Sequence, residues 1–389
     1  MLNIWLQLVH KNEKEEMMLI NEKISGLHKK LKDRQWLEIQ NQTRSFSDGF
    51  QQRKTKREQM GMALFQTTIA TSGITAEDFN RCLYAANSDP RFQFLTGLPG
   101  VALMYSTIAV AFQDSCFGSR SAVVGETAAL NGIIARILDS LIDDVPKIIA
   151  PERSTLFRLL NKQGWLESTI LPADEELDTK HPAASVLYKF IRGWITKVKG
   201  AEYWQQETSS IPDEFSSAVE AALTTEYDTI GCVLPASSED YNPDVRHILL
   251  AKSRNTFWIP AMTPALFVGW PEGLNKTAYK SCIHRFGDLI GWLDDMTDII
   301  EDIEKGEANE ILLDLYENAG KPHYASPEEF QDMLLNWLDD DRAVTTLVTK
   351  GRAIYSETIQ AFESLGRDTT PILHLTTDLT QLALKSVTA

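Results

Sequence analysis

An acidic run directly follows an apolar segment near residue 290, and this pairing constrains the fold more than any other feature of the chain. The segment 286–293 is largely apolar, and 294–302 reads Asp-Asp-Met-Thr-Asp-Ile-Ile-Glu-Asp. At helical spacing Asp294, Asp298 and Asp302 share a face, where like charges repel unless a cation compensates them. A solvated acidic face is the alternative. The apolar lead favours a cation site because the acids then leave a buried helix.

Two glycines precede the acids on the same predicted helical face. Gly291 and Gly287 lie three and seven residues before Asp294. A glycine inside a helix costs about 1 kcal/mol relative to alanine, so two glycines at this spacing need a reason. The spacing leaves two explanations open: a neighbouring helix packs closely against this face, or a ligand chain runs along it from the acids.

A second acidic pair lies upstream and repeats the arrangement. Asp139 and Asp143 share a helical face behind an apolar lead, and Ala135 and Gly132 lie four and seven residues before Asp139. Pro146 is expected to end the helix near this acidic tip, where carboxylates oppose the helix dipole and need a counter-ion. Two such helices facing each other would form a cleft with an acidic rim and an apolar floor that is poor in side chains.

Carboxylate oxygens of this kind suit Mg²⁺. The ion commonly takes one or two carboxylates and leaves its other positions to water and substrate phosphate. The sequence therefore predicts that the acidic rim holds a metal-bound phosphate ligand. The candidate metal ligands are Asp139, Asp143, Asp144, Asp294, Asp295, Asp298 and Asp302.

A group of basic residues precedes the aromatic pair Phe257 and Trp258 and could contact a diphosphate directly. Arg246 and Lys252 are six residues apart, so they and Arg254 cannot all share one helical face, and at least one of them only solubilises the chain. Arg254 ranks first. The predicted diphosphate-binding residues are Arg254, Lys252, Arg246 and Lys305.

The charge balance narrows the class of partner. A formal net charge of −16 argues against nucleic acid, which needs a basic surface. The same charge makes a polyanionic ligand unexpected unless divalent metal bridges it, and the two acidic motifs could supply that metal. With 43% hydrophobic and 24% charged residues, the 389-residue chain has an ordinary globular composition.

The sequence predicts a cytoplasmic protein. No apolar run approaches the roughly 20 residues of a membrane span, so no transmembrane segment is expected. The first residues lack the apolar core of a secretory signal. The four cysteines are widely separated, as is typical of core thiols in a reducing compartment.

Helical periodicity runs through most of the chain, and alternating strand patterns are nearly absent, which predicts an all-α fold. We expect an N-terminal helical extension at 1–60 and one α-domain at 61–389. Thr75 to Asp78 is typical of a helix N-terminus. The expected helices are 17–36, 101–112, 123–143, 184–198, 215–223, 245–266 (broken at Pro260 and Pro264) and 276–304, with a further helix start at Ser326-Pro327.

Other motifs carry less weight. Asp339 to Asp341 form a third acidic cluster that we interpret as a solvated face. His181 and His247 have no partner at metal-ligand spacing and are interpreted as structural or surface residues. Motifs for dinucleotide binding, P-loop phosphate binding and elbow-serine catalysis are absent from the sequence.

Three windows resemble motifs of the class I isoprenoid synthase superfamily. Residues 138–144 resemble the first aspartate motif, Asp-x-x-x-Asp, of squalene and phytoene synthases, and 298–306 resemble their second motif with its trailing glycine. Residues 291–298 are similar to the second Asp-Asp-x-x-Asp motif of trans-prenyltransferases. The resemblance implies a helical bundle around a central apolar cavity, with a diphosphate held by Mg²⁺, three ions by analogy.

The chain departs from two branches of that superfamily. It lacks the Gly-Gly-Lys-Arg-type segment of chain-elongating prenyltransferases and the Asn-Asp-x-x-Ser-x-x-x-Glu motif of ordinary microbial terpene cyclases. What remains is similar to the bacterial large-terpene synthases. This placement implies a class I terpene synthase that ionises a linear prenyl diphosphate, cyclises the carbocation and releases diphosphate.

The resemblance also assigns roles to residues. Asp139, Asp143, Asp294 and Asp298 are predicted to be catalytic, and Tyr105 and Phe112 join the aromatic residues that could steady a cation. A prenyl-coupling transferase of the squalene or phytoene type and a non-catalytic helical protein are the alternatives, and assembly into a homodimer is left open. The predicted substrate cavity is lined by Gly132, Ala135, Gly287, Gly291, Phe257 and Trp258.

Overall fold

The structure is a computed structural model, and most of the chain after residue 62 can be described. The predicted N-terminal extension, the expected helix at 17–36, and the segments around Asp144, His181 and Ser326-Pro327 lie outside the described residues. The described stretches are 63–88, 90–118, 121–143, 182–206, 208–233, 242–318 and 340–386, with single residues and pairs between them.

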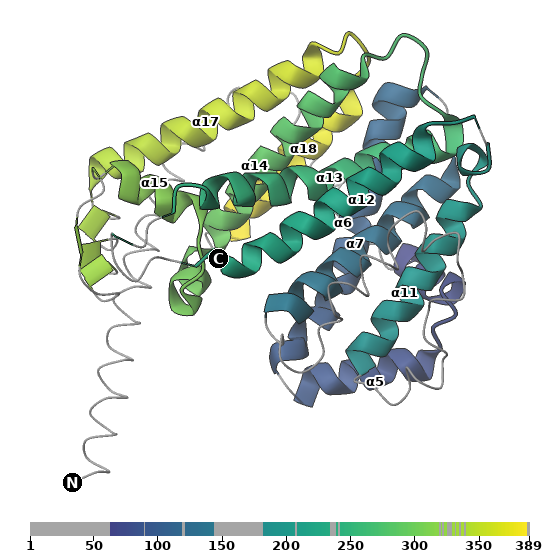
Figure 1. Cartoon of the computed structure of the whole chain (residues 1–389), viewed down its shortest axis with the longest axis horizontal. Coiled ribbons are helices and arrows are strands. Elements are labelled where there is room, and N and C mark those ends of the chain that lie inside the picture. The colour runs from purple at the N-terminus through teal and green to yellow at the C-terminus, as the bar shows by residue number, and fades with distance from the viewer. Residues whose placement is uncertain are drawn as a thin grey trace.

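Helices make up the regular structure of the described residues, and the only strand-like pairing there is one antiparallel bridge between Val233 and Glu307. The predicted all-α class is therefore confirmed. In chain order the main helices are α5 (Ala76–Ser88), α6 (Leu98–Phe112), α7 (Ala122–Asp143), α11 (Pro182–Lys199), α12 (Ile211–Asp228), α13 (Val245–Val268), α14 (Lys276–Lys305), α15 (Glu310–Asn318), α17 (Asp341–Glu363) and α18 (Thr370–Ser386) (Figure 1).

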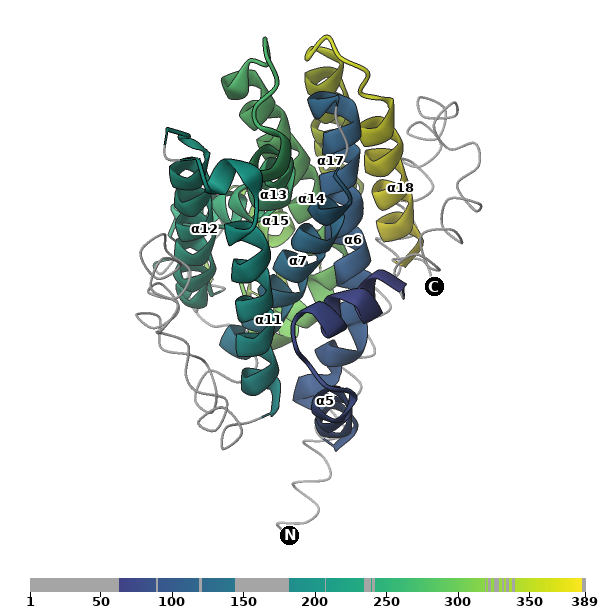
Figure 2. The same ribbon diagram turned by 90° about the vertical axis from the view of Figure 1, so that its right-hand side faces the viewer.

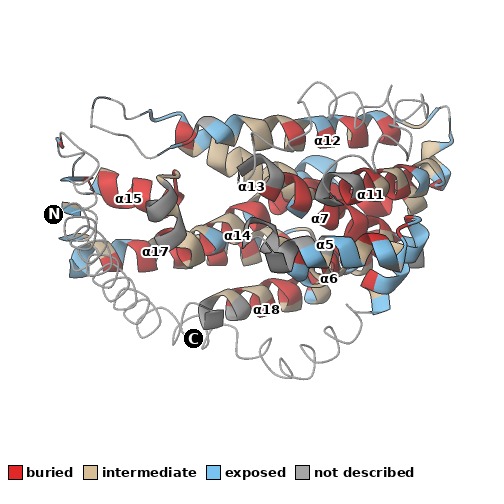
Figure 3. Cartoon of the chain, turned by 90° about the horizontal axis from the view of Figure 1, so that it is seen from below, coloured by how far each residue is buried: buried red, intermediate tan, exposed pale blue. Residues whose placement is uncertain are grey.

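Helix α13 is the centre of the bundle. It packs against α12 and α14 on either side and against the α6–α7 pair. Figure 2 shows α12, α13 and α14 side by side, with α11 next to α7. The buried residues concentrate where α7, α11 and α13 run together (Figure 3). A second apolar cluster joins the later part of α14 to α15 and α17.

Local sequence signals explain two helix boundaries. At the start of α5 the Thr75 hydroxyl accepts from the Asp78 backbone N–H at 3.1 Å, and the Asp78 carboxylate accepts from the Thr75 N–H at 2.8 Å. This reciprocal capping satisfies two backbone donors and confirms the predicted N-terminus. At α17, Asp340 accepts from the Arg342 N–H at 2.8 Å, and Asp341 is exposed. These two residues of the third acidic cluster therefore start a helix at the surface.

The expected break in α13 is wrong. The helix is continuous from Val245 to Val268 and contains both Pro260 and Pro264. Proline removes a helical hydrogen bond and usually kinks or ends a helix. Here the whole stretch 257–266 is buried, so packing against the surrounding helices offsets the lost bonds.

One helical stretch is longer and more apolar than the sequence analysis expected. The 24 residues Phe94–Phe117 meet a length and composition test for a membrane span, and 44% of the tested window is buried. An eight-residue 3-10 helix before α6 (Pro90–Gly97) and a π-helical turn after it (Gln113–Phe117) lengthen the helix at both ends. Core helices of water-soluble bundles pass the same test.

The three cysteines with described side chains, Cys116, Cys232 and Cys282, are buried and free.

Candidate active site

The two predicted acidic motifs meet at one end of the bundle, where α7, α12, α13 and α14 converge. Lys252 on α13 lies between two carboxylates: its Nζ donates to Asp139 Oδ1 at 2.9 Å and forms an ion pair with Glu226 Oε1 at 3.1 Å. Asp139 comes from α7 and Glu226 from α12. The second oxygen of Asp139 accepts from Arg136 at 3.0 Å. Asp139 is thus fixed by two cations, and Lys252 links three helices.

Asp139 and Glu226 differ in acidity although their carboxyl groups share a hydrogen bond. Burial alone would raise the pKa of Asp139, but the Lys252 ammonium and hydrogen bonds from Glu226 and Lys252 hold it below the usual value. Burial also raises the pKa of Glu226, and the negative charge of Asp139 adds to this against the opposing Lys252, to about 8. Asp139 is therefore the more acidic of the two carboxyl groups.

Asp294 on α14 lies within electrostatic reach of this group. Its side chain keeps contact with solvent, yet the protein packed around it and the negative charges of Asp298 and Asp139 raise its pKa to about 6. Among the described residues Asp294 forms no ion pair, whereas Asp298 accepts from the Thr297 hydroxyl at 2.9 Å. Lys252 and Arg136 oppose this rise, so they compensate only part of the negative charge around Asp294.

The acids of α14 separate onto two faces. Asp295 Oδ2 accepts from the Glu310 N–H at 2.7 Å, which caps the start of α15, and burial raises the pKa of Asp295 well above its usual value. Asn309 donates to Asp302 at 2.5 Å and to the Asp295 carbonyl at 2.7 Å. At about 100° per residue Asp302 lies almost directly above Asp295, not above Asp294. Asp294 and Asp298 therefore face the α7 acids, while Asp295 and Asp302 face α15.

Within the described part of the chain, no group of three or more aspartate, glutamate, histidine or cysteine side chains is arranged to hold a metal ion. The side chain of Asp143, in the last turn of α7, and the whole of Asp144 lie outside the described residues. The assignment of Asp139, Asp143, Asp294 and their neighbours as metal ligands stays a prediction.

The structure separates the three predicted diphosphate-binding cations whose side chains are described. Arg254, ranked first from sequence, donates to both oxygens of Asp288 on α14 at 2.6 and 3.0 Å. Arg246 is held by three acids of α15. The side chain of Lys305 lies outside the described residues. Lys252 is the predicted cation that lies on the acidic site.

Sequence reasoning missed Asp288, the partner of Arg254, and Glu226, and these two residues differ in how easily they could have been found. Asp288 interrupts the apolar segment before the acidic run, and a buried carboxylate needs a cation, so a basic partner could have been inferred. Glu226 sits at the end of an ordinary amphipathic helix. Only the packing of α12 on α13 brings it to Lys252.

The small residues before the acids are explained by close packing. A Cβ on Gly287 would lie 2.9 Å from the Arg254 Cα and 3.0 Å from the Ser253 carbonyl oxygen, and one on Gly291 would meet the Ser253 side chain. A Cβ on Gly132 would meet the ring of Tyr105. Of the two explanations for the glycines, the contact between α13 and α14 therefore accounts for Gly287 and Gly291. Their predicted role, with Ala135, in a substrate cavity stays untested.

A buried aromatic layer lies beneath the acids. Tyr105 on α6 is fully enclosed, and its burial and the charges of Asp139, Glu226 and Asp294 raise the pKa of its hydroxyl, which places the ring next to the site. Tyr105 stacks on Phe257 with ring centroids 6.0 Å apart. The floor of the site is thus aromatic rather than poor in side chains, because Tyr105 fills the space beside Gly132.

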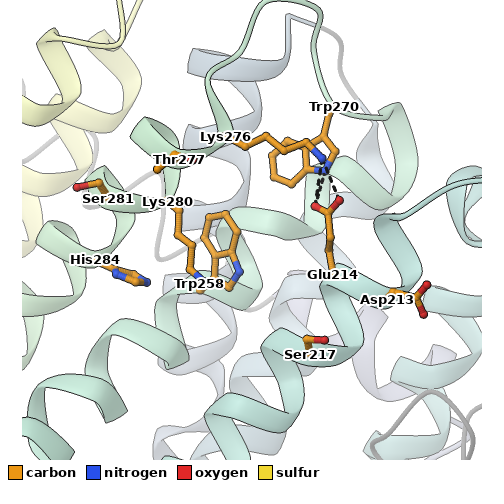
Figure 4. Close-up of a pocket in the computed structure, with 10 residues that line it drawn as sticks. All are labelled: Asp213, Glu214, Ser217, Trp258, Trp270, Lys276, Thr277, Lys280, Ser281 and His284. Atoms are coloured by element: carbon orange, nitrogen blue, oxygen red, sulfur yellow. Dashed lines mark hydrogen bonds and ion pairs between the residues drawn. The ribbon is translucent and has the colours of Figure 1, made fainter.

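Trp258 points to a different region. It lines a pocket of about 760 Å³ between the first turns of α12 and α14, over the face of α13. Trp270 stacks on Trp258 at 6.3 Å, while Glu214 accepts from Trp270 Nε1 and Lys276 at 3.0 and 2.9 Å (Figure 4). None of the predicted metal ligands lines this pocket. It lies about three helical turns from Asp294 along α14, so the structure separates Trp258 from the acidic site.

One of the comparisons with known proteins bears on the fold. The sequence matches no protein-family model, and a search of curated proteins found no match. Among solved structures the chain is similar to a geranylgeranyl pyrophosphate synthase from Lactobacillus brevis complexed with citrate, with a TM-score of 0.51 and 13% identity over 87% of this chain and 98% of that chain. A farnesyl pyrophosphate synthase from T. brucei aligns with a TM-score of 0.43 and 10% identity over 85% and 99%. The fold is the isoprenoid-synthase type of helical bundle, as predicted.

Proposed function

We propose that this chain is a class I isoprenoid synthase, a Mg²⁺-dependent enzyme that ionises a linear prenyl diphosphate and cyclises the resulting carbocation. The observation that carries the proposal is the meeting of Asp139, Lys252 and Asp294 from three helices at one end of the bundle. Carboxylates and a cation at one rim can hold a diphosphate and its metal. The likeness to a prenyl-processing fold supports the same reading.

The donor set at this rim fits Mg²⁺. It consists of carboxylate oxygens, which the ion prefers. The charges of Asp298 and Asp139 raise the pKa of Asp294, and a divalent cation would relieve this repulsion. Asp139, Asp143, Asp294 and Asp298 would hold the metal, with Asp144 of second rank. A bound ion would neutralise the charge that develops on the leaving diphosphate.

The chain's own residues would do the rest. Lys252 is placed to donate to a phosphate oxygen, as a point charge beside the acids. Burial beneath the site excludes water from a reactive cation. Tyr105 and Phe257 present aromatic rings there, which can steady a carbocation through a cation–π interaction.

Prenyl transfer is the second candidate function. The solved structure with the better alignment is named as a geranylgeranyl pyrophosphate synthase, which favours a transferase acting on prenyl diphosphates. Prenyl coupling of the squalene or phytoene type, with two prenyl diphosphates, belongs to the same class. Both candidates use the same acidic rim and differ in what traps the carbocation.

One experiment separates these functions. The purified chain is incubated with Mg²⁺ and geranyl, farnesyl or geranylgeranyl diphosphate, with and without isopentenyl diphosphate. A cyclic hydrocarbon from a single substrate supports cyclisation. A lengthened or doubled chain supports transfer instead. Failure to release diphosphate from every substrate contradicts both and favours the non-catalytic helical protein.

A further inference from the structure

Glu226 belongs to the acidic site although no predicted motif includes it. It lies in the last turn of α12, and its side chain is only 12% exposed. Oε1 lies 3.1 Å from Lys252 Nζ, and the carboxyl group also shares a hydrogen bond with Asp139. Glu226 therefore contacts both the cation and the first acid of the site.

We propose that Glu226 is a positioning residue that, together with Asp139, holds the Lys252 ammonium at the acidic rim, ready for a diphosphate oxygen. The inference rests on the proposed function for the ligand, but the contact that it names is independent of any reaction. No other residue of α12 is needed for it.

A lysine in this role needs to be held because its side chain is long and flexible. Fixing it in one rotamer costs up to about 2 kcal/mol of conformational free energy. Two carboxyl groups on different helices, with oxygens 2.9 and 3.1 Å from Nζ, confine it to one place before a ligand arrives. The ligand then meets a cation that is already in position, which improves affinity.

Asp139 alone could not do this throughout binding. Arg136 holds its Oδ2, and Lys252 holds its Oδ1. If Asp139 turns an oxygen toward a metal ion, one of these contacts weakens. Glu226 is then the anchor that remains on Lys252, because it approaches from α12 and not from the helix that carries the first motif.

The test uses a set of matched variants of the full chain. E226L removes both polar contacts at similar volume. E226Q keeps them, since its amide oxygen can accept from Lys252 and its NH₂ can donate to Asp139. E220L changes an exposed glutamate of the same helix and serves as the control, and K252M sets the full loss. Circular dichroism and thermal unfolding check that each variant folds.

Two measurements are made on each variant. The first is the affinity for inorganic pyrophosphate with Mg²⁺, by calorimetry. We expect E226L to weaken it about tenfold, in line with the loss of one hydrogen bond to a charged group. E226Q should stay within about threefold of wild type, and E220L should match wild type.

The second measurement is the rate at which acetic anhydride labels Lys252, followed by peptide mass spectrometry. The reagent must reach the Lys252 amine, and the Asp139 and Glu226 carboxyl groups beside Nζ restrict its access. Labelling should accelerate several-fold in E226L and remain near the wild-type rate in E226Q and E220L. Because this readout needs no substrate, it tests the contact even if wild type turns over no prenyl diphosphate.

Two results would overturn the proposal. One is an unchanged Lys252 labelling rate in E226L. The other is an equal loss of pyrophosphate affinity in E226Q and E226L, since packing would then matter and the polar contacts would not. If E226L does not fold, E226D replaces it: the shorter side chain keeps the carboxyl group but withdraws it from Lys252, so it should lose more affinity than E226Q.

Discussion

Two acidic clusters of this bundle are built from the same residue types and are balanced differently. On α15, Glu310, Asp314 and Glu317 all pair directly with cations: Arg246 contacts the three of them, and Lys350 contacts Glu310 and Asp314. At the acidic site Lys252 and Arg136 hold Asp139, but Asp294 has no ion pair among the described residues.

The two clusters differ in how their carboxylates are compensated, and this difference indicates which cluster would bind an external cation. In the α15 cluster the acids raise the pKa of Arg246, so charge is compensated inside the protein and ties α13, α15 and α17 together. At the acidic site the protein packed around Asp294 and the neighbouring negative charges raise the pKa of this solvent-accessible carboxyl to about 6 instead. The first cluster is a structural tie, and the second keeps a negative charge that a divalent ion would balance.

The largest effect is expected from the site acids. D139N and D298N should each lower turnover of the accepted prenyl diphosphate by at least about a hundredfold, because each removes charge from the predicted metal rim. D244N, at an exposed aspartate before α13, should keep the wild-type rate. Steady-state release of diphosphate measures all three. Wild-type rates in both D139N and D298N would show that these acids are not needed for turnover.

The α15 cluster should respond in stability instead. R246M removes the cation that three acids of α15 share and should lower the free energy of unfolding by about 2 kcal/mol, while the affinity for Mg²⁺ and pyrophosphate stays unchanged. K276M breaks the more exposed pair with Glu214 and should cost less than about 1 kcal/mol. Urea unfolding gives both values. A weaker affinity for pyrophosphate in R246M would show that the α15 cluster also contributes to ligand binding at the acidic site.

Substitutions at glycine test whether α13 and α14 are closely packed before the second acidic motif. In G287A the new Cβ would press on the backbone of α13, so we expect a loss of about 1–2 kcal/mol in spite of the better helix propensity of alanine. G100A in α6 has open space around its Cβ and should be neutral or up to about 1 kcal/mol more stable. Thermal unfolding compares them. Equal stability in the two variants would mean that the face beside Gly287 has space to spare.

The smallest effect concerns pH. The pKa of Asp294 is about 6 in the folded chain, above the roughly 3.9 of an unfolded aspartate, so the folded state binds the proton more tightly. Between about pH 4 and 6 the stability of the metal-free protein should therefore fall as pH rises. In D294N this part of the decline should disappear. Urea unfolding at several pH values measures the free energy of unfolding of both proteins. The same pH dependence in both would contradict a raised pKa of Asp294 in the folded chain.

The helices and the two acidic motifs could be predicted because they depend on local spacing. The period of apolar residues indicated α7, α11, α13 and α14 to within a few residues, and the Thr75–Asp78 cap was visible as a motif. The proline break failed because sequence does not report how completely a helix is buried. Segment 257–266 is enclosed on all sides, and that burial keeps the helix intact.

The site could be predicted only in part. Spacing put Asp294 and Asp302 on one stripe, but the acids of α14 turn to different partners because Asn309 and Glu310 lie beside Asp295 and Asp302. The ranking of the cations had no local signal either. Arg254 and Lys252 are two residues apart, so they leave α13 on different sides, and their neighbours decide their partners.

By itself the sequence determined the helical class, the pairing of apolar segments with acidic tips, and the excess of negative charge that calls for a cation. These follow from residue type and from spacing along one helix. Only the tertiary structure decided which acids face each other, which cation joins them, and that Glu226 belongs to the site. Those outcomes depend on which helices pack together, and packing brings together residues that are distant in sequence, such as Asp139, Glu226 and Lys252.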